Sequence, residues 1–281
     1  MKRVAFCVVN SDYIDPCVVA LTSFFRYNNI ETIVFYESGT NIRVLKSALG
    51  EYPVEFRERE FPHLAEHEII GDKYFNLFVS RESLPAFAMR LKALDELKSE
   101  YDVIVNFDID TLFFNTIMPI VSKCSDRHIY GVSERMNRDR WVRSLGVSDI
   151  APYPVYINTG FCVYGSEALK RVDIMSDYAD FLRKNAQHVY CPEQDYLNVR
   201  FADVITEIPE HYNLMFTSQN YVNIAPVMVH YLGSDKPWSH YRSSDRHIAS
   251  YFKRYLVECQ RCSSWLSEEF IRNVTQKMQL L

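Results

Sequence analysis

The residues with the clearest chemical potential are two aspartates, Asp108 and Asp110, which follow an apolar run. The run 103–107 predicts a buried strand, and the two carboxylates come directly after it with one residue between them. In extended geometry alternate side chains share a face, so both can reach one cation. Oxygen ligands of this kind suit Mg²⁺ or Mn²⁺, which also bind phosphate oxygens. We interpret the pair as a metal site, in preference to a turn that carries two solvated aspartates.

A second chemistry uses the same residues. In phosphatases of the haloacid dehalogenase type a strand ends in Asp-x-Asp-x-Thr, and the first aspartate, here Asp108, is phosphorylated. In this chain Thr111 follows the second aspartate without the intervening residue. A complete β-α-β layer is also predicted before the motif. Both features count against this alternative, which stays open as the weaker one.

Alternating strands and helices are expected to position these carboxylates. The predicted strands are 3–9, 32–36, 54–57 and 102–107. Helical periodicity predicts a helix that opens at Asp15-Pro16, and two more over 42–49 and 83–97. This order favours an α/β fold with a mostly parallel sheet covered by helices. Ligands of such sheets bind at the carboxyl ends of the strands, where 10–13 and 108–110 both lie.

The pattern loosens after Leu112 into short strands with longer connections. The expected strands are 129–133, 155–164, 204–208 and 227–231, and the expected helices are 166–185 and 193–200. Phe252, Tyr255 and Cys259 mark an amphipathic C-terminal helix. No linker divides the chain, so we expect one domain over residues 1–240 with a C-terminal helical extension, 241–281, packed on it.

The composition excludes several classes of protein. Hydrophobic residues make up 48% and charged residues 24% of the 281, so the chain can bury a core and is not disordered. A net charge of −5 argues against a nucleic-acid partner. No apolar run approaches the roughly 20 residues that span a bilayer. The apolar run near the N-terminus ends too early for a signal peptide, so a cytoplasmic location is expected.

Two features leave alternatives open. Cys259 and Cys262 form one CxxC without a second pair or a neighbouring histidine, so we prefer a helix with two incidental thiols to a zinc site. Four C-terminal arginines lie beside aromatic residues, as in segments that contact a membrane surface. They are Arg242, Arg246, Arg254 and Arg261. Because nearby glutamates dilute this charge, we prefer a packed helix to a peripheral contact with the inner face of the cytoplasmic membrane.

Three further motifs follow the aspartate pair in order. They are Tyr156-Ile-Asn158-Thr-Gly160-Phe, Glu193-Gln194-Asp195-Tyr-Leu197-Asn198 and His230-Tyr-Leu-Gly233-Ser-Asp-Lys236-Pro237-Trp238. From about residue 3 to residue 238, the series resembles family 8 of the retaining glycosyltransferases, the group of glycogenin and the bacterial lipopolysaccharide glucosyl- and galactosyltransferases. The resemblance implies a GT-A fold, a UDP-sugar donor, and Mn²⁺ with Mg²⁺ as the alternative. It also implies transfer of a hexose to a saccharide, glycolipid or other hydroxyl acceptor, in polysaccharide or lipopolysaccharide biosynthesis.

The resemblance implies which residues hold the donor. Those matched to uracil and ribose are Asn10, Asp12 and Tyr13. Arg90 corresponds to an arginine on the donor's phosphates and sugar, Gly233 permits a tight turn, and Lys236 supplies a point charge for the diphosphate.

The same resemblance implies the metal and sugar sites. The metal ligands would be Asp108, Asp110 and His230. Asn158 would face the sugar, and Gln194 would lie beneath the anomeric carbon. Glu193 would hold sugar hydroxyls; it replaces the aspartate usual in the family, which lengthens the arm.

A mechanism follows from these implied roles. Cleavage of the bond to UDP spreads negative charge over the diphosphate while the sugar ring becomes oxocarbenium-like. Mn²⁺, Arg90 and Lys236 would stabilise that charge. Because Gln194 is a poor nucleophile, we expect the acceptor to attack on the face that UDP leaves. Besides the phosphatase, a UDP-sugar-binding protein without turnover is the second alternative.

Overall fold

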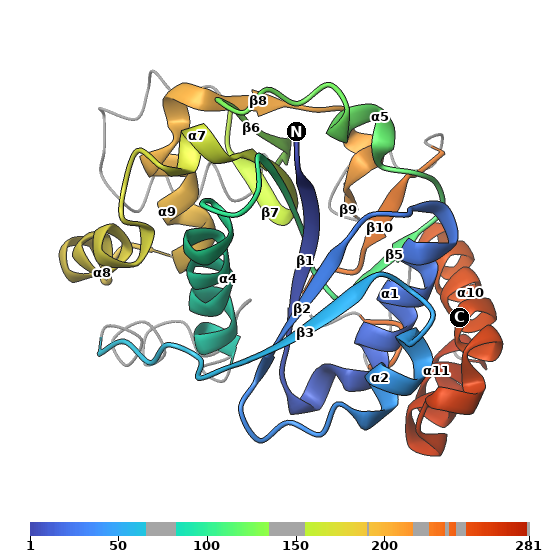
Figure 1. Cartoon of the computed structure of the whole chain (residues 1–281). Coiled ribbons are helices and arrows are strands. Elements are labelled where there is room, and N and C mark those ends of the chain that lie inside the picture. Colours follow the sequence, from blue (N-terminus) through green and yellow to red (C-terminus); the bar gives the residue numbers. More distant parts are fainter. Residues whose placement is uncertain are drawn as a thin grey trace.

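A seven-stranded sheet runs through the centre of the molecule (Figure 1), in the order β3-β2-β1-β4-β7-β6-β8. The computed structural model describes residues 1–65, 83–134, 155–189, 191–215, 225–233, 236–239 and 246–279. The strands of the sheet are β1 (Arg3–Val9), β2 (Thr32–Glu37), β3 (Val54–Arg59), β4 (Val103–Phe107), β6 (Ile129–Ser133), β7 (Ile157–Gly165) and β8 (Ile205–Glu207). The neighbours from β3 to β4 are parallel, β7 is antiparallel to β4 and β6, and β8 is parallel to β6. The predicted α/β architecture with a mostly parallel sheet is confirmed.

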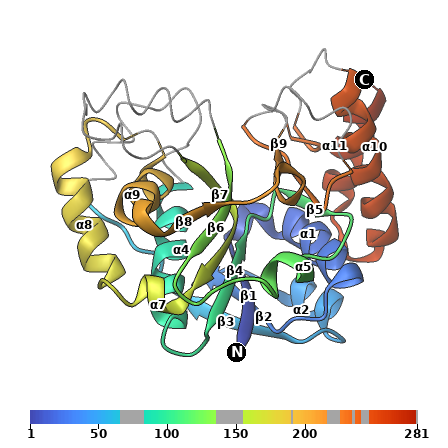
Figure 2. The ribbon, with the colours of Figure 1, turned by 90° about the horizontal axis from the view of Figure 1, so that it is seen from above.

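Helices cover both faces of this sheet (Figure 2). On one face lie α1 (Ile14–Tyr27), α2 (Arg43–Leu49), α10 (Arg246–Arg261) and α11 (Glu268–Gln279). On the other lie α4 (Leu84–Leu97), α7 (Ser166–Leu169), α8 (Ile174–Asn185) and α9 (Pro192–Arg200). Each layer has its own apolar core against the sheet, so β1 and β4 are buried from both sides. Burial on both faces explains why these strands have continuous apolar sequences.

A second, three-stranded sheet positions the candidate site. It consists of β5 (Thr111–Phe113), β10 (Met228–His230) and β9 (Leu214–Met215), in the order β5-β10-β9. The strand β10 runs antiparallel to β5 and pairs His230 with Thr111. The next residue, Tyr231, donates its N–H to the Asp110 carbonyl over 2.9 Å. This pairing carries His230 across more than a hundred residues of sequence to the aspartate pair.

Several local predictions were wrong. The helix expected over 166–185 is interrupted, because Asp173 caps α8 by accepting the N–H of Ser176 at 3.1 Å. The short elements β5, β9 and α5 (Met118–Val121) were not predicted, since two to four residues show no periodicity. Four 3₁₀ turns complete the described structure: Ser11–Tyr13, Ala202–Val204, Glu210–Tyr212 and Ser263–Trp265.

The two C-terminal helices pack on the rest of the chain. Phe252, Tyr255 and Cys259 of α10 are buried in the same core as α1. Glu258 accepts both hydrogen bonds of the Arg26 guanidinium, at 2.5 and 2.6 Å. Residues 240–245 lie outside the described residues, so the domain boundary at 240 stays a prediction.

The buried face of α10 also accounts for the CxxC. Cys259 and Cys262 are free and buried, and the Cys262 thiol donates to the Glu258 carbonyl at 3.1 Å. Burial raises the pKa of Cys262 to about 12, so it is held as a thiol. Within the described residues no group of three or more possible metal ligands includes these two thiols, so two incidental helix thiols fit better than a zinc site.

Two of the four C-terminal arginines contact other residues of the chain, and the side chains of the other two lie outside the described residues. Arg254 lies over the Phe114 ring, 5.2 Å from its centroid, and Arg261 pairs with Glu258. Arg242 and the side chain of Arg246 lie outside the described residues. Within the described residues, no helix combines the length and the apolar character that crossing a membrane requires.

Candidate active site

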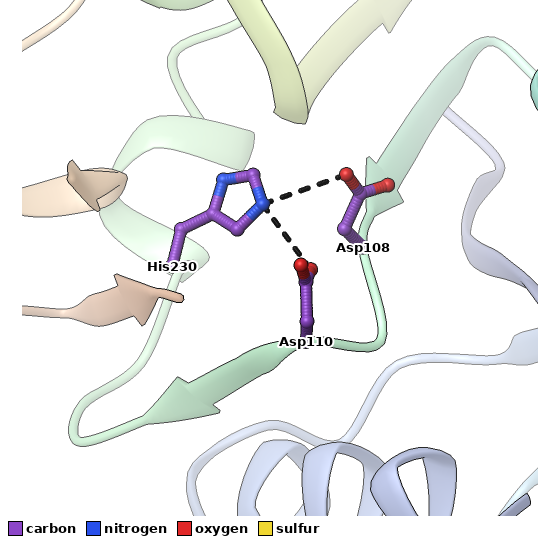
Figure 3. Close-up of side chains that lie close together, drawn as sticks. All are labelled: Asp108, Asp110 and His230. Atoms are coloured by element: carbon purple, nitrogen blue, oxygen red, sulfur yellow. Dashed lines mark ion pairs between the residues drawn. The ribbon is translucent and has the colours of Figure 1, made fainter. Parts of the chain in front are cut away.

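Asp108, Asp110 and His230 converge at the carboxyl end of β4 (Figure 3). The Nε2 atom of His230 lies 3.2 Å from Asp110 Oδ1 and 3.6 Å from Asp108 Oδ2. One possible ligand atom from each residue lies within 4.8 Å of the other two. Two carboxylates and an imidazole suit a divalent ion such as Mn²⁺. Within the described residues no other group of this kind is found. The predicted metal ligands are therefore placed together.

Gly160 gives His230 its place beside the aspartates. Its carbonyl accepts the Asp108 N–H at 2.9 Å, at the end of the β4–β7 pairing. A Cβ at this position would lie 2.0 Å from Cε1 of the His230 ring. The structure shows that the close neighbour is the imidazole.

Lys236 neutralises the outer side of the aspartate pair. Its ammonium pairs with Asp110 and donates to the Tyr231 carbonyl at 2.5 Å. Burial alone would raise the pKa of Asp110, but Lys236 and His230 outweigh it and hold that pKa well below its usual range. The Asp110 carboxylate is therefore ionised and ready to accept a cation.

Arg90 connects the metal-binding carboxylates to the second motif. Its guanidinium donates to Asp108 Oδ1 at 2.5 Å and to Glu193 Oε2 at 3.0 Å. Only 6% of Arg90 is exposed, and its guanidinium lies 4.9 Å from the Phe87 ring centroid. Burial raises the pKa of Glu193 to about 7 although Arg90 opposes this. The arginine is thus rigidly held between two carboxylates.

The carboxamide of Gln194 is fully hydrogen-bonded. Its Oε1 accepts from the Thr159 N–H at 3.1 Å and from Asn158 Nδ2 at 3.2 Å. Its Nε2 donates to Glu134 Oε2 at 3.0 Å and to the Tyr156 hydroxyl oxygen at 3.1 Å. The side chain is buried at the first turn of α9, which begins at Pro192.

Asn158 is held in the same way from the neighbouring strand. Its Oδ1 accepts from the Gly160 N–H and from Asn213 Nδ2, both at 2.9 Å. Its Nδ2 donates to Glu134 Oε2 at 2.9 Å. The two carboxamides therefore share one buried network.

The predicted nucleotide residues lie directly after β1. Asn10 follows β1 directly, and its buried Oδ1 has no hydrogen-bond partner among the described residues. Asp12 is exposed in the following 3₁₀ turn. The Tyr13 ring meets the Trp238 ring edge-on at 6.4 Å. Burial raises the pKa of Tyr13, with Lys236 opposing and Asp110 adding to the shift.

Gly233 belongs to the loop that brings Lys236 back to Asp110. Its φ of +68° lies in the left-handed region, as a tight turn requires. Residues 234 and 235 of this loop lie outside the described residues.

The chain matches the model of glycosyl transferase family 8 over residues 4–241. It belongs to this family. The predicted family, GT-A fold and enzyme class are thereby confirmed, and this family 8 glycosyltransferase has an Asp-Asp-His group suited to a divalent metal.

Individual relatives are distant. Lipopolysaccharide glucosyltransferase WaaO of Escherichia coli K12 is 22% identical over 94% of this chain and 79% of its own length. Galactinol synthase 5 of Arabidopsis thaliana is 34% identical over 34% of this chain and 28% of its own length.

Among solved structures, galactosyltransferase LgtC with donor and acceptor sugar analogs has a TM-score of 0.73 at 17% identity, covering 96% of this chain and 99% of its own. Glycosyltransferase GlyE of Streptococcus pneumoniae TIGR4 has a TM-score of 0.64 at 16% identity, covering 98% and 64%. At such identities these structures show that the fold is shared.

Sequence reasoning missed part of the site of this family 8 enzyme. Glu134 and Asn213 lie outside the quoted motifs, yet both bond to Asn158. Tyr156 and Asp195 lie inside the motifs without a predicted role, and the Tyr156 hydroxyl donates to Asp195 at 2.5 Å. A lone glutamate or asparagine gives no local signal, because its partners lie tens of residues away.

Proposed function

We propose that this glycosyltransferase moves a hexose, glucose or galactose, from a UDP-sugar to a hydroxyl of a saccharide or glycolipid, with retention of anomeric configuration. The relatives named as a glucosyltransferase and as galactinol synthases support a hexose. The observation that carries the proposal is the convergence of three motifs at the end of β4. There Arg90 joins Asp108, beside Asp110 and His230, to Glu193, the residue before Gln194.

The nucleotide is proposed to bind where β1 ends. The unpaired oxygen of Asn10 can accept the ring N–H of a uracil, and Tyr13 offers an aromatic surface. Asp12 is exposed next to them and can accept ribose hydroxyls. Gly233 and Lys236 then bring a cation to the side of the diphosphate.

Asp108, Asp110 and His230 are proposed to hold Mn²⁺, with Mg²⁺ as the alternative. A bound divalent ion supplies positive charge that stabilises a diphosphate leaving group. Lys236 and Arg90 lie on two sides of the aspartate pair and add fixed positive charge there. With the leaving group stabilised in this way, no general acid is needed to protonate it.

Same-face attack is the proposed route to retention. The Oε1 atom of Gln194 already accepts two hydrogen bonds, from Thr159 N–H and from Asn158, so its lone pairs are engaged. This arrangement does not favour nucleophilic attack by Gln194. Glu193 is tied to Arg90 and Thr159, where it can receive sugar hydroxyls. The departing phosphate oxygen then accepts the proton of the acceptor.

Membership in family 8 supports an enzyme of glycosyl transfer over a phosphatase or a protein that binds UDP-sugars without turnover. No contact in the described residues favours either of those two alternatives.

Release of UDP from a panel of UDP-sugars tests the proposal. UDP-glucose or UDP-galactose should be turned over with Mn²⁺, and excess EDTA should stop turnover. Asp108→Asn and Asp110→Asn should each lower the rate by at least about 100-fold, because a metal contributes several kcal/mol to such a step.

Asp102→Asn is the matched control, since Asp102 lies at the opposite end of β4 with 51% of its side chain exposed. Full metal-dependent activity in both site variants would overturn the metal assignment. NMR of the product tests retention, and a β-linked product would overturn that part of the proposal.

A further inference from the structure

Glu134 is a buried carboxylate behind the proposed sugar site. It follows β6 directly, and only 5% of it is exposed. Its N–H donates to the Tyr156 carbonyl at 2.7 Å, which ties its backbone to the residue before β7. The pairing of β6 with β7 shifts register between Gly131 and Ser133. A shift of this kind redirects the side chains that follow it, here toward the interior of the site.

One oxygen of Glu134 receives two carboxamides. Its Oε2 accepts from Asn158 Nδ2 at 2.9 Å and from Gln194 Nε2 at 3.0 Å. These are the two amides proposed to face the donor sugar, and they come from β7 and α9. The carboxylate therefore joins two elements at the point where the sugar is expected.

These contacts fix which way each carboxamide points. An ionised carboxylate only accepts hydrogen bonds and a backbone N–H only donates them, whereas the two ends of a carboxamide are nearly equal in shape. Gln194 lies between Glu134 and the Thr159 N–H, and Asn158 lies between Glu134 and the Gly160 N–H. Turning either amide over would place its NH₂ group against a backbone N–H and its oxygen against the Glu134 oxygen, so one hydrogen bond would be lost at each end.

We infer that Glu134 is a positioning residue for glycosyl transfer, which sets the orientation of the Gln194 and Asn158 carboxamides. This inference rests on the proposed function, since it takes both amides to face the donor sugar. Glu134 acts through them and through its ability to accept hydrogen bonds; a negative charge beside the sugar is not its contribution. Misplacement of a positioning group by about 1 Å can cost on the order of 100-fold in rate.

Two substitutions separate these roles. Glu134→Ala removes the acceptor, and kcat should fall on the order of 100-fold. Glu134→Gln keeps an oxygen where both donors meet and removes only the charge. It should be at least about ten times more active than Glu134→Ala, because neutral hydrogen bonds keep roughly half the strength of charge-assisted ones. The affinity for UDP, measured by calorimetry with Mn²⁺, should stay unchanged in both.

Glu258 supplies a matched control. Glu258 lies in the C-terminal helix α10 and is similarly buried, at 3% exposed. It accepts two hydrogen bonds from Arg26 of α1. Glu258→Ala and Glu258→Gln should lower the melting temperature without a change in kcat. If Glu134→Ala keeps full activity, or if Glu134→Gln is as inactive as Glu134→Ala, the positioning role is overturned.

A measurement independent of turnover separates this inference from the proposed function. The side-chain NH₂ signals of Gln194 and Asn158 should shift in Glu134→Ala and remain near their wild-type positions in Glu134→Gln. If the wild-type protein turns over no UDP-sugar, the proposed function fails while these NMR signals still decide whether Glu134 orients the amides. Unchanged signals in Glu134→Ala would overturn the inference.

Discussion

At residue 160 the lack of a side chain determines where His230 can lie. The imidazole fills the space above the glycine, and an added Cβ would come within 2.0 Å of Cε1 and 2.4 Å of Nδ1. The same glycine donates its N–H to Asn158 and accepts the N–H of Asp108. One small residue therefore fixes the positions of His230, Asp108 and Asn158 relative to one another.

Gly160→Ala should weaken metal binding and stability together. The new methyl group must displace His230 from the aspartates, which should lower Mn²⁺ affinity by about 10–100-fold, the range for lost support of a ligand. Overpacking should also cost about 1–3 kcal/mol of unfolding free energy. Calorimetric titration with Mn²⁺ and urea unfolding measure the two effects.

Gly50→Ala is the control for Gly160→Ala. Gly50 ends α2 in helical geometry, and a Cβ there meets nothing closer than the Lys46 carbonyl oxygen at 3.2 Å. It should bind Mn²⁺ like the wild type. Equal Mn²⁺ affinity in Gly160→Ala would show that His230 is not a ligand or that its position does not depend on the glycine.

At the scale of elements, the helix α9 is clamped to β7 by one asparagine. Asn198 accepts the Ile157 N–H at 2.7 Å and donates to the Ile157 carbonyl at 2.8 Å. This buried exchange imitates the pairing of a neighbouring strand. These two bonds fix the position of α9 along β7. They thereby help to position Glu193 and Gln194, which lie in the first turn of α9.

Asn198→Ala should therefore affect stability and chemistry. It leaves the N–H and the carbonyl of buried Ile157 without their partner, at a cost of about 1–3 kcal/mol of unfolding free energy. The helix α9 loses its two bonds to Ile157 and keeps those of Glu193 and Gln194 to Thr159, so its first turn should shift; kcat should fall while UDP affinity is retained. Urea unfolding and steady-state kinetics on the UDP-sugar measure both.

Asn185→Ala is a milder comparison, because Asn185 makes a single bond to the Phe181 carbonyl within α8 at 2.8 Å. Its kcat should equal that of the wild type. If Asn198→Ala is destabilised but has an unchanged kcat, the clamp serves stability alone.

The elements differ in how far the sequence predicts them, for a physical reason. The strands β1 and β4 are buried on both faces, which requires continuous apolar runs that are visible locally. The strands β5 and β9 have only three and two residues, and they are defined by their pairing with β10, more than a hundred and about fifteen residues away in the sequence. The same distinction holds in the site: Asp108 and Asp110 follow a visible strand, whereas Glu134 is identified by its bonds to Asn158 and Gln194.

At the scale of the whole molecule, the C-terminal helices belong to the core that supports the site. Phe252 of α10 contacts Tyr231 at 5.6 Å between ring centroids, and Trp238 contacts Phe270 of α11 at 5.7 Å. Tyr231 follows His230 directly and accepts the Lys236 ammonium on its carbonyl oxygen. A chain of packed rings thus connects the surface helices to the metal-binding group.

The molecule should consequently unfold as one unit, and Phe252→Ala tests this. Phe252 is fully buried, so its truncation should cost about 3–5 kcal/mol and lower the melting temperature. Because the lost contact supports Tyr231, Mn²⁺ affinity should fall as well. Val257 lies on the outer side of the same helix and is 46% exposed. Val257→Ala should change the free energy of unfolding by no more than about 0.5 kcal/mol. Calorimetry should show a single transition for wild type and for both variants. A separate early transition in Phe252→Ala, with metal binding surviving it, would mean that α10 and α11 form an appendage whose packing the site does not need.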